Sequence, residues 1–221
     1  MRLIQFVFCS LFLLSTCPGL AQVQMGIFAG PQLTTARYQI GEVSQPTSQK
    51  IGLQAGYMLK VPFDNQLFFA PAAFYSLKGY KVRFNQPSYP PDTAAVDNNT
   101  TIHTLELAVM LQYDFSTRPD HLFLKSGITL DGQLFGNETY HLRNGKEVSE
   151  KMKFSFGEYG YAGSNFLVIL GYETAGGFTV FGQYSLGLGN LSNADGGPQI
   201  HHRGFSLSVG RYFHRRKPTA P

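Results

Sequence analysis

Apolar and polar residues alternate with a period of two along most of this chain, the spacing that turns successive side chains to opposite faces of a β-strand. In residues 105–115, Leu105 and Leu107 belong to an apolar face, whereas Glu106 and Asp114 belong to a polar one. The same division recurs in residues 24–33, 51–61, 122–134, 178–188 and 205–213. Two further segments, residues 67–84 and 163–173, are apolar enough to be strands but alternate less regularly. The pattern therefore predicts eight strands.

The segments between these strands alternate in length. Short turns are expected at residues 62–65, 116–121 and 174–177, and the longer connections are expected at residues 39–49, 85–101, 137–156 and 190–200. Transmembrane β-barrels show this alternation, because short turns join the strands on the periplasmic side and longer loops extend outward. We therefore predict an all-β fold, an eight-stranded antiparallel up-and-down transmembrane β-barrel, with both chain termini in the periplasm.

The two ends of such a sheet must meet. Hydrocarbon contains no water to pair the N–H and C=O groups of an edge strand, so the last strand is expected to pair with the first. Eight strands enclose a lumen that side chains can fill, and we expect a plugged lumen rather than a wide pore. The alternative is a soluble lipocalin-like barrel that binds a small ligand, and it would turn inward Leu105, Leu107, Val109 and Leu111.

The first 21 residues have the character of a secretory signal peptide. Arg2 precedes an apolar run over residues 3–14, and small residues near Ala21 suit a cleavage site. The expected division is a cleaved signal peptide (1–21), an outer-membrane barrel domain (22–213) and a basic C-terminal tail (214–221). Both cysteines would leave with the signal peptide, whereas a rival interpretation makes Cys17 a lipidated N-terminus. Either interpretation exports the chain.

Composition agrees with strands and does not indicate nucleic acid as a partner. The chain is 14% charged and 14% aromatic, a mixture typical of half-buried strands. A formal charge of +4 on 221 residues is a mild excess, too small to indicate a nucleic-acid surface. Aromatic residues near the predicted strand ends are expected to form girdles at the membrane interfaces: Tyr38, Tyr80, Tyr113, Phe115, Tyr172, Tyr212 and Phe213.

Inward-facing polar residues are the first candidates for a functional site, because charges in a narrow lumen must be paired. Lys78, Glu106 and Asp131 come from three successive predicted strands and fall at a broadly similar height. We predict that Lys78 neutralises one or both acids, and we assign Lys125 and Gln112 to the same polar lining of the lumen. A salt bridge that fixes strand register is the simpler interpretation, and a proton or ion path is the functional alternative.

The histidines form no recognisable catalytic or metal-binding motif. His121 and His214 are expected at the periplasmic end, and the presumed outer end is expected to contain His103, His141, His201 and His202. A metal site would need a fixed spacing that they lack, and a hydrolase would need a Ser–His pair that the sequence does not reveal. We therefore predict no catalytic residue, no metal and no cofactor; a barrel-embedded lipid-modifying enzyme is the alternative.

Several of these segments resemble the PorT-like outer-membrane β-barrel family of Bacteroidetes-type bacteria. Residues 26–30 (GIFAG) and 71–79 (PAAFYSLKG) are similar to its first and third strands, and residues 105–115 (LELAVMLQYDF) and 181–191 (FGQYSLGLGNL) to its fourth and seventh. The chain departs from the family at two positions: Ala72 stands where the family often has Glu, and Ala108 stands where it often has Pro. The resemblance implies an outer-membrane barrel, and some relatives assist protein secretion or gliding.

The expected protein is a small, monomeric, non-enzymatic barrel of the cell outer membrane. Its expected role is structural, binding or secretion-accessory, through loops on the extracellular side. The expected partners are outer-membrane lipids and a protein at the extracellular or periplasmic face.

Overall fold

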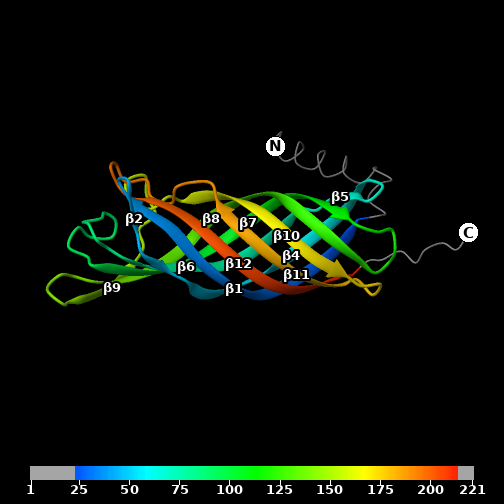
Figure 1. Cartoon of the computed structure of the whole chain (residues 1–221), viewed down its shortest axis with the longest axis horizontal. Coiled ribbons are helices and arrows are strands. Elements are labelled where there is room, and N and C mark those ends of the chain that lie inside the picture. Colours follow the sequence, from blue (N-terminus) through cyan, green and yellow to red (C-terminus); the bar gives the residue numbers. More distant parts are fainter. Residues whose placement is uncertain (1–22, 214–221) are drawn as a thin grey trace, which may run out of the picture.

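The computed structural model describes residues 23–213, which form one elongated, closed antiparallel sheet (Figure 1). Eight long strands make the barrel: β1 (Gln24–Ile40), β4 (Lys50–Asp64), β6 (Ala72–Arg83), β7 (Asp97–Asp114), β8 (His121–His141), β10 (Ala162–Glu173), β11 (Phe178–Gly187) and β12 (Gln199–Tyr212). Four short strands extend it: β2 (Val43–Gln45), β3 (Thr47–Ser48), β5 (Leu67–Phe69) and β9 (Glu147–Lys151). Among these residues there is no helix long and apolar enough to cross a membrane.

Pairing between the first and last strands closes the barrel. β1 pairs with β12 from Gly26 opposite Tyr212 to Gln39 opposite Gln199. On its other side β1 pairs with β4, and the remaining long strands pair antiparallel with their neighbours along the chain. Within residues 23–213 every long strand therefore has a partner on both sides, and the predicted eight-stranded barrel is confirmed.

Several strands are longer than the apolar pattern predicts, and β7 and β8 extend furthest into the expected connections. β7 begins at Asp97 and β8 ends at His141, so parts of the connections expected at residues 85–101 and 137–156 are strands. β9 then pairs back onto β8 as a hairpin. The loop prediction is wrong at these positions because a strand that leaves the membrane no longer needs an apolar outer face, and the alternation fades there.

The predicted third strand is interrupted. Residues 67–84 are divided into β5 and β6 at Ala70 and Pro71. Proline has no N–H to donate to a neighbouring strand, whereas its carbonyl oxygen still accepts a hydrogen bond from the Leu59 N–H at 2.9 Å. The sheet is therefore continuous around the barrel, with a local break at the proline.

A band of exposed apolar side chains surrounds the part of the barrel nearer the short turns. On β7 the side chains of Leu105, Leu107, Val109 and Leu111 are 49–58% exposed and point away from the lumen, so the soluble lipocalin-like alternative is wrong. The band on this strand ends at Phe115, ten residues after Leu105. At about 3.3 Å per residue and a tilt of about 40°, its height is roughly 25 Å, the apolar height of an outer-membrane barrel.

The predicted aromatic girdle divides into two groups. Four members lie outside, 44–58% exposed at strand ends beside the short turns: Tyr113, Phe115, Tyr172 and Phe213. The other three are at most 3% exposed and point into the lumen: Tyr38, Tyr80 and Tyr212. The girdle prediction is wrong for these three because of strand parity; Tyr38, for example, lies five residues after the outward-facing Leu33, and an odd step turns the side chain inward.

Two apolar clusters fill the lumen at different heights. The cluster nearer the short turns, here the periplasmic cluster, consists of Phe28, Met58, Phe74, Ala108, Met110, Phe123, Leu167, Ile169, Phe181 and Tyr212. The ring of Phe28 packs edge-on against Phe74 and Phe181, with ring centres 5.6 Å apart in both pairs. The outer cluster, at the other end, consists of Ala36, Tyr38, Tyr80, Val82, Ile102, Met152, Tyr159, Leu191 and Ile200.

Glycine makes room for the periplasmic cluster. A Cβ atom at Gly171 would lie 2.5 Å from Cζ of Phe123 and 2.6 Å from Cβ of Phe181, closer than real side chains approach. The absent side chain on β10 therefore lets two aromatic rings meet inside a narrow barrel.

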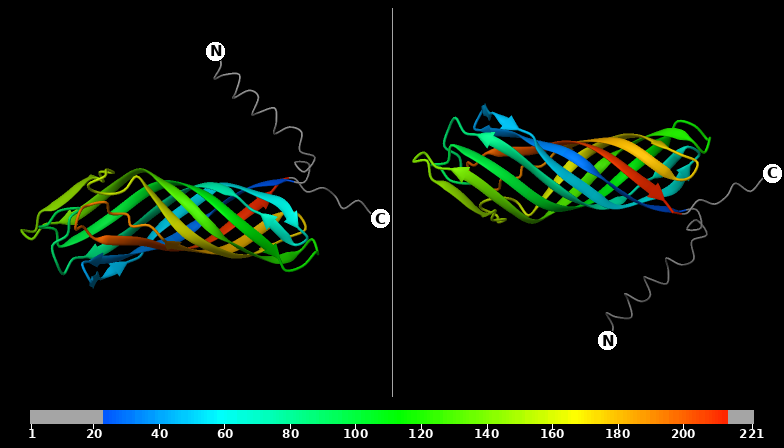
Figure 2. Two further views of the ribbon diagram at one scale, coloured as in Figure 1. Left: turned by 90° about the horizontal axis from the view of Figure 1, so that it is seen from above. Right: turned by 90° about the horizontal axis from the view of Figure 1, so that it is seen from below.

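The start of β1 and the end of β12 lie at the same end of the barrel as the short turns (Figure 2). Outer-membrane barrels place their short turns in the periplasm, so we call this end periplasmic and the opposite end extracellular. The expected signal peptide (1–21) and basic tail (214–221) both lie outside the described residues.

Lysine in place of Val109 should destabilise the barrel by about 2–4 kcal/mol, because it puts a charge near the middle of the apolar band. Val109 is 58% exposed and faces outward, so the change adds no strain in the lumen. Guanidinium unfolding in lipid vesicles measures the effect. Asn99→Lys, on the same face of β7 but beyond the band, is the control and should change stability by less than about 0.5 kcal/mol. An equal loss in both variants would show that the band is misplaced.

Candidate functional site

Three charged side chains meet between the two apolar clusters. Lys78 Nζ lies 2.7 Å from Glu106 Oε1 and 3.4 Å from Asp131 Oδ2. All three residues are at most 7% exposed. Glu106 and Asp131 are direct partners across β7 and β8, so their like charges would repel each other without the ammonium group between them. The structure thus brings together the three residues that the sequence predicts as a group, here called the Lys78 layer.

Amide groups complete the Lys78 layer. Asn165 Nδ2 donates to Asp131 Oδ1 and Gln133 Nε2 donates to Asp131 Oδ2, both at 3.2 Å. These donors help to stabilise the second carboxylate, which a single lysine neutralises only in part. The cavity beside this layer, lined in part by His202, has a volume of about 10 Å³. That is room for about one water molecule and not for a ligand.

Lys125 and Gln112 face the same lumen but belong to other layers. Lys125 Nζ lies 3.2 Å from the Tyr212 hydroxyl and 4.8 Å from the centre of the Phe123 ring, within the periplasmic cluster. Gln112 Nε2 donates to a carboxylate oxygen of Asp114 at 2.6 Å. Six residues of β8, about 20 Å of strand, separate Lys125 from the acid of the Lys78 layer. The five predicted residues therefore do not form one network.

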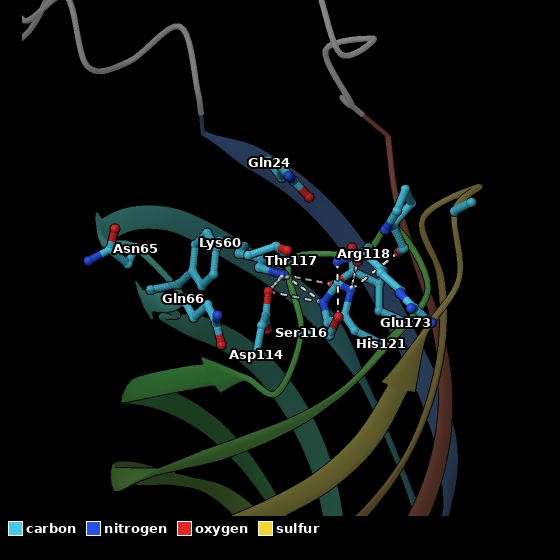
Figure 3. A pocket seen from close by; sticks show the side chains of 13 residues that line it. Gln24, Lys60, Asn65, Gln66, Asp114, Ser116, Thr117, Arg118, His121 and Glu173 are labelled. Atoms are coloured by element: carbon cyan, nitrogen blue, oxygen red, sulfur yellow. Dashed lines mark hydrogen bonds and ion pairs between the residues drawn. The ribbon is translucent and has the colours of Figure 1, made fainter.

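A second ionic group, which the sequence pattern did not predict, lies at the periplasmic mouth (Figure 3). Lys60 Nζ lies 2.6 Å from Asp114 Oδ2 and 2.9 Å from Glu173 Oε2. His121 Nε2 lies 3.0 Å from the same oxygen of Asp114 and 3.6 Å from the same oxygen of Glu173. All four side chains are at most 6% exposed. We call these four residues the mouth cluster.

The mouth cluster assembles where four strands meet the short turns. Asp114 and Glu173 end β7 and β10, His121 begins β8, and Lys60 lies near the end of β4. Strand alternation alone puts Lys60 and Asp114 on inward faces. The ends of the strands at the short turns also lie at a similar height in the barrel. The inward direction and the shared height together could have predicted the cluster from the sequence.

A cavity of about 550 Å³ opens above the mouth cluster at the periplasmic end (Figure 3). Its walls include Gln24, Phe68 and residues of the turn between β7 and β8. The ring centre of Phe68 lies 4.4 Å from Lys60 Nζ, so this cation also contacts an aromatic face. The volume suits a small molecule or a few side chains of a peptide.

The mouth cluster is not arranged as a hydrolase site. A serine nucleophile needs a histidine nitrogen that is free to accept its proton. His121 Nε2 faces Asp114, and its Nδ1 lies 2.9 Å from the carbonyl oxygen of Arg118, so both ring nitrogens are engaged. Ser116 lines the same cavity, but its hydroxyl accepts a hydrogen bond from the Arg118 N–H at 3.1 Å. The geometry supports an ion-paired plug rather than acyl transfer.

The other described histidines are dispersed. His103 lies within β7 and stacks on Phe135 with ring centres 4.0 Å apart. His141, at the end of β8, lies 3.0 Å from Asp97 and 3.2 Å from Glu147. In residues 23–213 no group of three or more His, Cys, Asp or Glu side chains is arranged to hold a metal ion.

The sequence matches the outer membrane protein beta-barrel domain family over residues 18–193, most of the chain. A comparison with curated protein sequences finds no match.

Solved structures of outer-membrane barrels are similar to this one. The outer membrane protein OprG from Pseudomonas aeruginosa has 12% identity and a TM-score of 0.50, over 88% of this chain and 97% of that chain. Neisserial surface protein A has 13% identity and a TM-score of 0.45, over 86% and 97%. Ail, the attachment invasion locus protein of Yersinia pestis, has 10% identity and a TM-score of 0.45, over 87% and 99%. At these identities the likeness to OprG shows the fold alone.

The family match covers most of the strands that carry the apolar band and all three residues of the Lys78 layer. Together with the closed ring of strands, it shows that this chain belongs to the outer membrane protein beta-barrel domain family and is a small barrel protein of the bacterial outer membrane.

Proposed function

We propose that this protein is a monomeric, non-conducting barrel that holds a rigid binding platform at the cell surface. The observation that carries the proposal is that side chains fill the lumen level after level while the sheet continues beyond the apolar band. From the periplasmic end, the levels are the mouth cluster, the periplasmic cluster, the Lys78 layer and the outer cluster. A barrel filled in this way offers a partner its outer surface instead of a channel.

The platform is the part of the sheet on the extracellular side of the band. On β7 it extends from Asp97 to the start of the band at Leu105. At about 3.3 Å per residue and a tilt of about 40°, these eight residues rise roughly 20 Å above the band. The outer cluster fills the interior at this height, so the platform is a packed continuation of the barrel and not a set of loose loops.

The hairpin of β8 and β9 projects furthest at the extracellular end (Figure 1). Cross-strand hydrogen bonds between side chains stiffen it. The Tyr140 hydroxyl donates to Glu150 at 2.8 Å, and the hydroxyls of Thr139 and Ser149 lie 3.1 Å apart. A stiff, polar hairpin can bind a partner with little loss of conformational entropy.

The connection between β6 and β7 folds over the extracellular opening. Ser88 is 3% exposed, and its hydroxyl lies 2.7 Å from the Tyr38 hydroxyl in the outer cluster. The Pro90 carbonyl oxygen lies 3.3 Å from the Tyr38 hydroxyl and 3.2 Å from the Ser88 hydroxyl. These contacts tie the connection to the barrel and support the assignment of a closed outer end.

A secretion-accessory role is the second candidate, and the 550 Å³ cavity at the periplasmic mouth favours it. The cavity faces the compartment that exported polypeptides cross, and its polar walls suit hydrogen bonding to a peptide. The resemblance of residues 71–79 and 105–115 to PorT-like barrels supports the same role, and we infer membership of that narrower group from these segments. Neither candidate includes a catalytic step, a metal or a cofactor.

The purified protein in planar lipid bilayers should show no steady ion conductance, because the lumen lacks room for a hydrated path. Truncation of two rings of the periplasmic cluster, Phe28→Ala with Phe181→Ala, should still give no steady conductance, because the mouth cluster, the Lys78 layer and the outer cluster continue to fill the lumen. Two outward-facing residues of the band provide the control, and Phe166→Ala with Phe205→Ala should also give no conductance. Steady conductance of the unaltered protein would contradict a closed lumen.

The hairpin of β8 and β9 should be held more firmly at low pH than at high pH. A hydrogen bond with Asp97, and then its charge, raise the pKa of His141 above its ordinary value of about 6.5. The stabilisation is therefore complete below about pH 6.5 and is lost as the pH rises through the raised pKa. Hydrogen exchange of β9 amides, corrected for intrinsic rates, should accelerate over that range. His141→Gln should remove the dependence, and a dependence that persists would exclude His141 as its source.

A photo-crosslinking side chain at Asn144 or Thr93, both exposed on the extracellular side, should give protein adducts in intact cells. The same side chain at Asp64, the last residue of β4, or at Thr117, in the turn between β7 and β8, is the matched comparison, and both residues are exposed at the periplasmic end. Adducts from the first pair support the platform. Adducts from the second pair alone would favour the secretion-accessory role, and no adducts from any position would contradict both.

A further inference from the structure

Four adjacent strands carry cations beyond the apolar band. Arg203 on β12, Arg37 on β1 and Lys81 on β6 occupy outward-facing positions, whereas Lys50 begins β4 on an inward-facing position, opposite the buried Thr34 of β1. The four strands are consecutive around the barrel. His201 lies directly opposite Arg37 across β12 and β1. We call these five residues the basic face.

On the other half of the circumference the long strands carry no such cation, and the cation at that level is Lys151 of β9, directly opposite Asn137. On β7 the positions that follow outward beyond the band are His103, Thr101 and Asn99, and on β8 they are Asn137 and Thr139. β10 begins with Ala162, Gly163 and Ser164, and β11 ends at Gly187. Cations that served only solubility would be expected all around the barrel. Their concentration on one side therefore indicates a ligand of opposite charge.

Acidic side chains do not neutralise the basic face. The ion pairs of residues 23–213 have as their cationic members only Lys60, Lys78, His121 and His141. The positive charges of Arg37, Lys81 and Arg203 are therefore available to an external anion.

Two members of the basic face differ in how their donors are used. Lys50 Nζ donates to the Thr100 carbonyl oxygen at 2.7 Å and to the Thr101 hydroxyl at 2.6 Å, so its position is fixed against β7. Nε of Arg203 is buried and has no hydrogen-bond partner in the described chain. A buried donor without an acceptor is costly.

The height of the basic face corresponds to lipid headgroups. Leu33 on β1 and Phe205 on β12 are direct partners and mark the outer edge of the apolar band on these strands. Arg203 lies two residues beyond Phe205, roughly 5 Å higher along a tilted strand. Long cationic side chains at this level reach the polar headgroups while their stems contact acyl chains.

We propose that the basic face binds the phosphate groups of an anionic glycolipid in the outer leaflet, with the acyl chains lying along Leu33 and Phe205. Guanidinium groups bind phosphate through paired N–H···O bonds, and a lysine adds a point charge. Arg203 and Lys81 are separated by about three strand spacings of about 4.8 Å, roughly 14 Å in all. That span exceeds a single phosphate and favours a headgroup that carries more than one. The proposal concerns the wall of the barrel and does not depend on what the platform binds.

Native mass spectrometry of the detergent-solubilised full chain tests the proposal with diphosphorylated lipid A as the probe. The variant Arg37→Gln, Lys81→Gln, Arg203→Gln should retain the lipid at least tenfold less well than the unaltered protein. The charge-conserving variant Arg37→Lys, Lys81→Arg, Arg203→Lys should retain most of the binding. All three positions face outward, and heat-dependent gel mobility checks that each barrel is folded.

The control removes three cations from the hairpin of β8 and β9, with Arg143→Gln, Lys146→Gln and Lys151→Gln, and should bind as the unaltered protein does. The same glycolipid without its phosphates should bind at least tenfold less well. The proposal is overturned if the basic-face variant binds within twofold of the unaltered protein, if the control loses as much, or if the dephosphorylated glycolipid or phosphatidylglycerol binds equally well.

Discussion

The hydrogen-bonding demand of the backbone inside hydrocarbon determines the rest of this structure. A lipid bilayer offers no water to an unpaired N–H or C=O group, so a strand can cross it only with a partner on both sides. The long contact between β1 and β12 meets that demand and turns a sheet into a cylinder. Closure with only eight strands makes the cylinder narrow, and a narrow cylinder must then be filled.

The filling is of two kinds, and each needs different chemistry. The rings of Phe28, Phe74 and Phe181 fill part of the lumen, and Gly171, which has no side chain, leaves room for its aromatic neighbours. Lys60 and Lys78 fill space with charge, and each is held between two carboxylates. Removal of one partner from such a buried group would leave a charge without compensation, at a cost of about 3–5 kcal/mol. The ionic layers thereby fix which strand faces which, because a slipped register would separate the charges.

The outer surface of the barrel changes from apolar to polar along its length. In the band its outer surface is apolar and contacts lipid, whereas on the extracellular side the outer surface is polar and the interior is the apolar outer cluster. One continuous sheet can do both because its inward face stays packed throughout. Arg37, Lys81 and Arg203 lie on one side of the barrel at the boundary between its apolar and polar outer surfaces. This boundary is at the level of the polar lipid headgroups.

Alternation in the sequence was sufficient to predict the strands, the closed barrel and the outward direction of Leu105 to Leu111, because side-chain direction within a strand follows parity. Parity also put Lys78, Glu106 and Asp131 on inward faces. Tertiary structure alone decided that Lys125 and Gln112 lie in other layers, that Lys60, Asp114, His121 and Glu173 meet at one mouth, and that β7 and β8 extend past the membrane. The physical reason is that the sequence pattern records which face a residue is on but not its height in the barrel. Height depends on tilt and on register between strands, and these are fixed only when the ring closes.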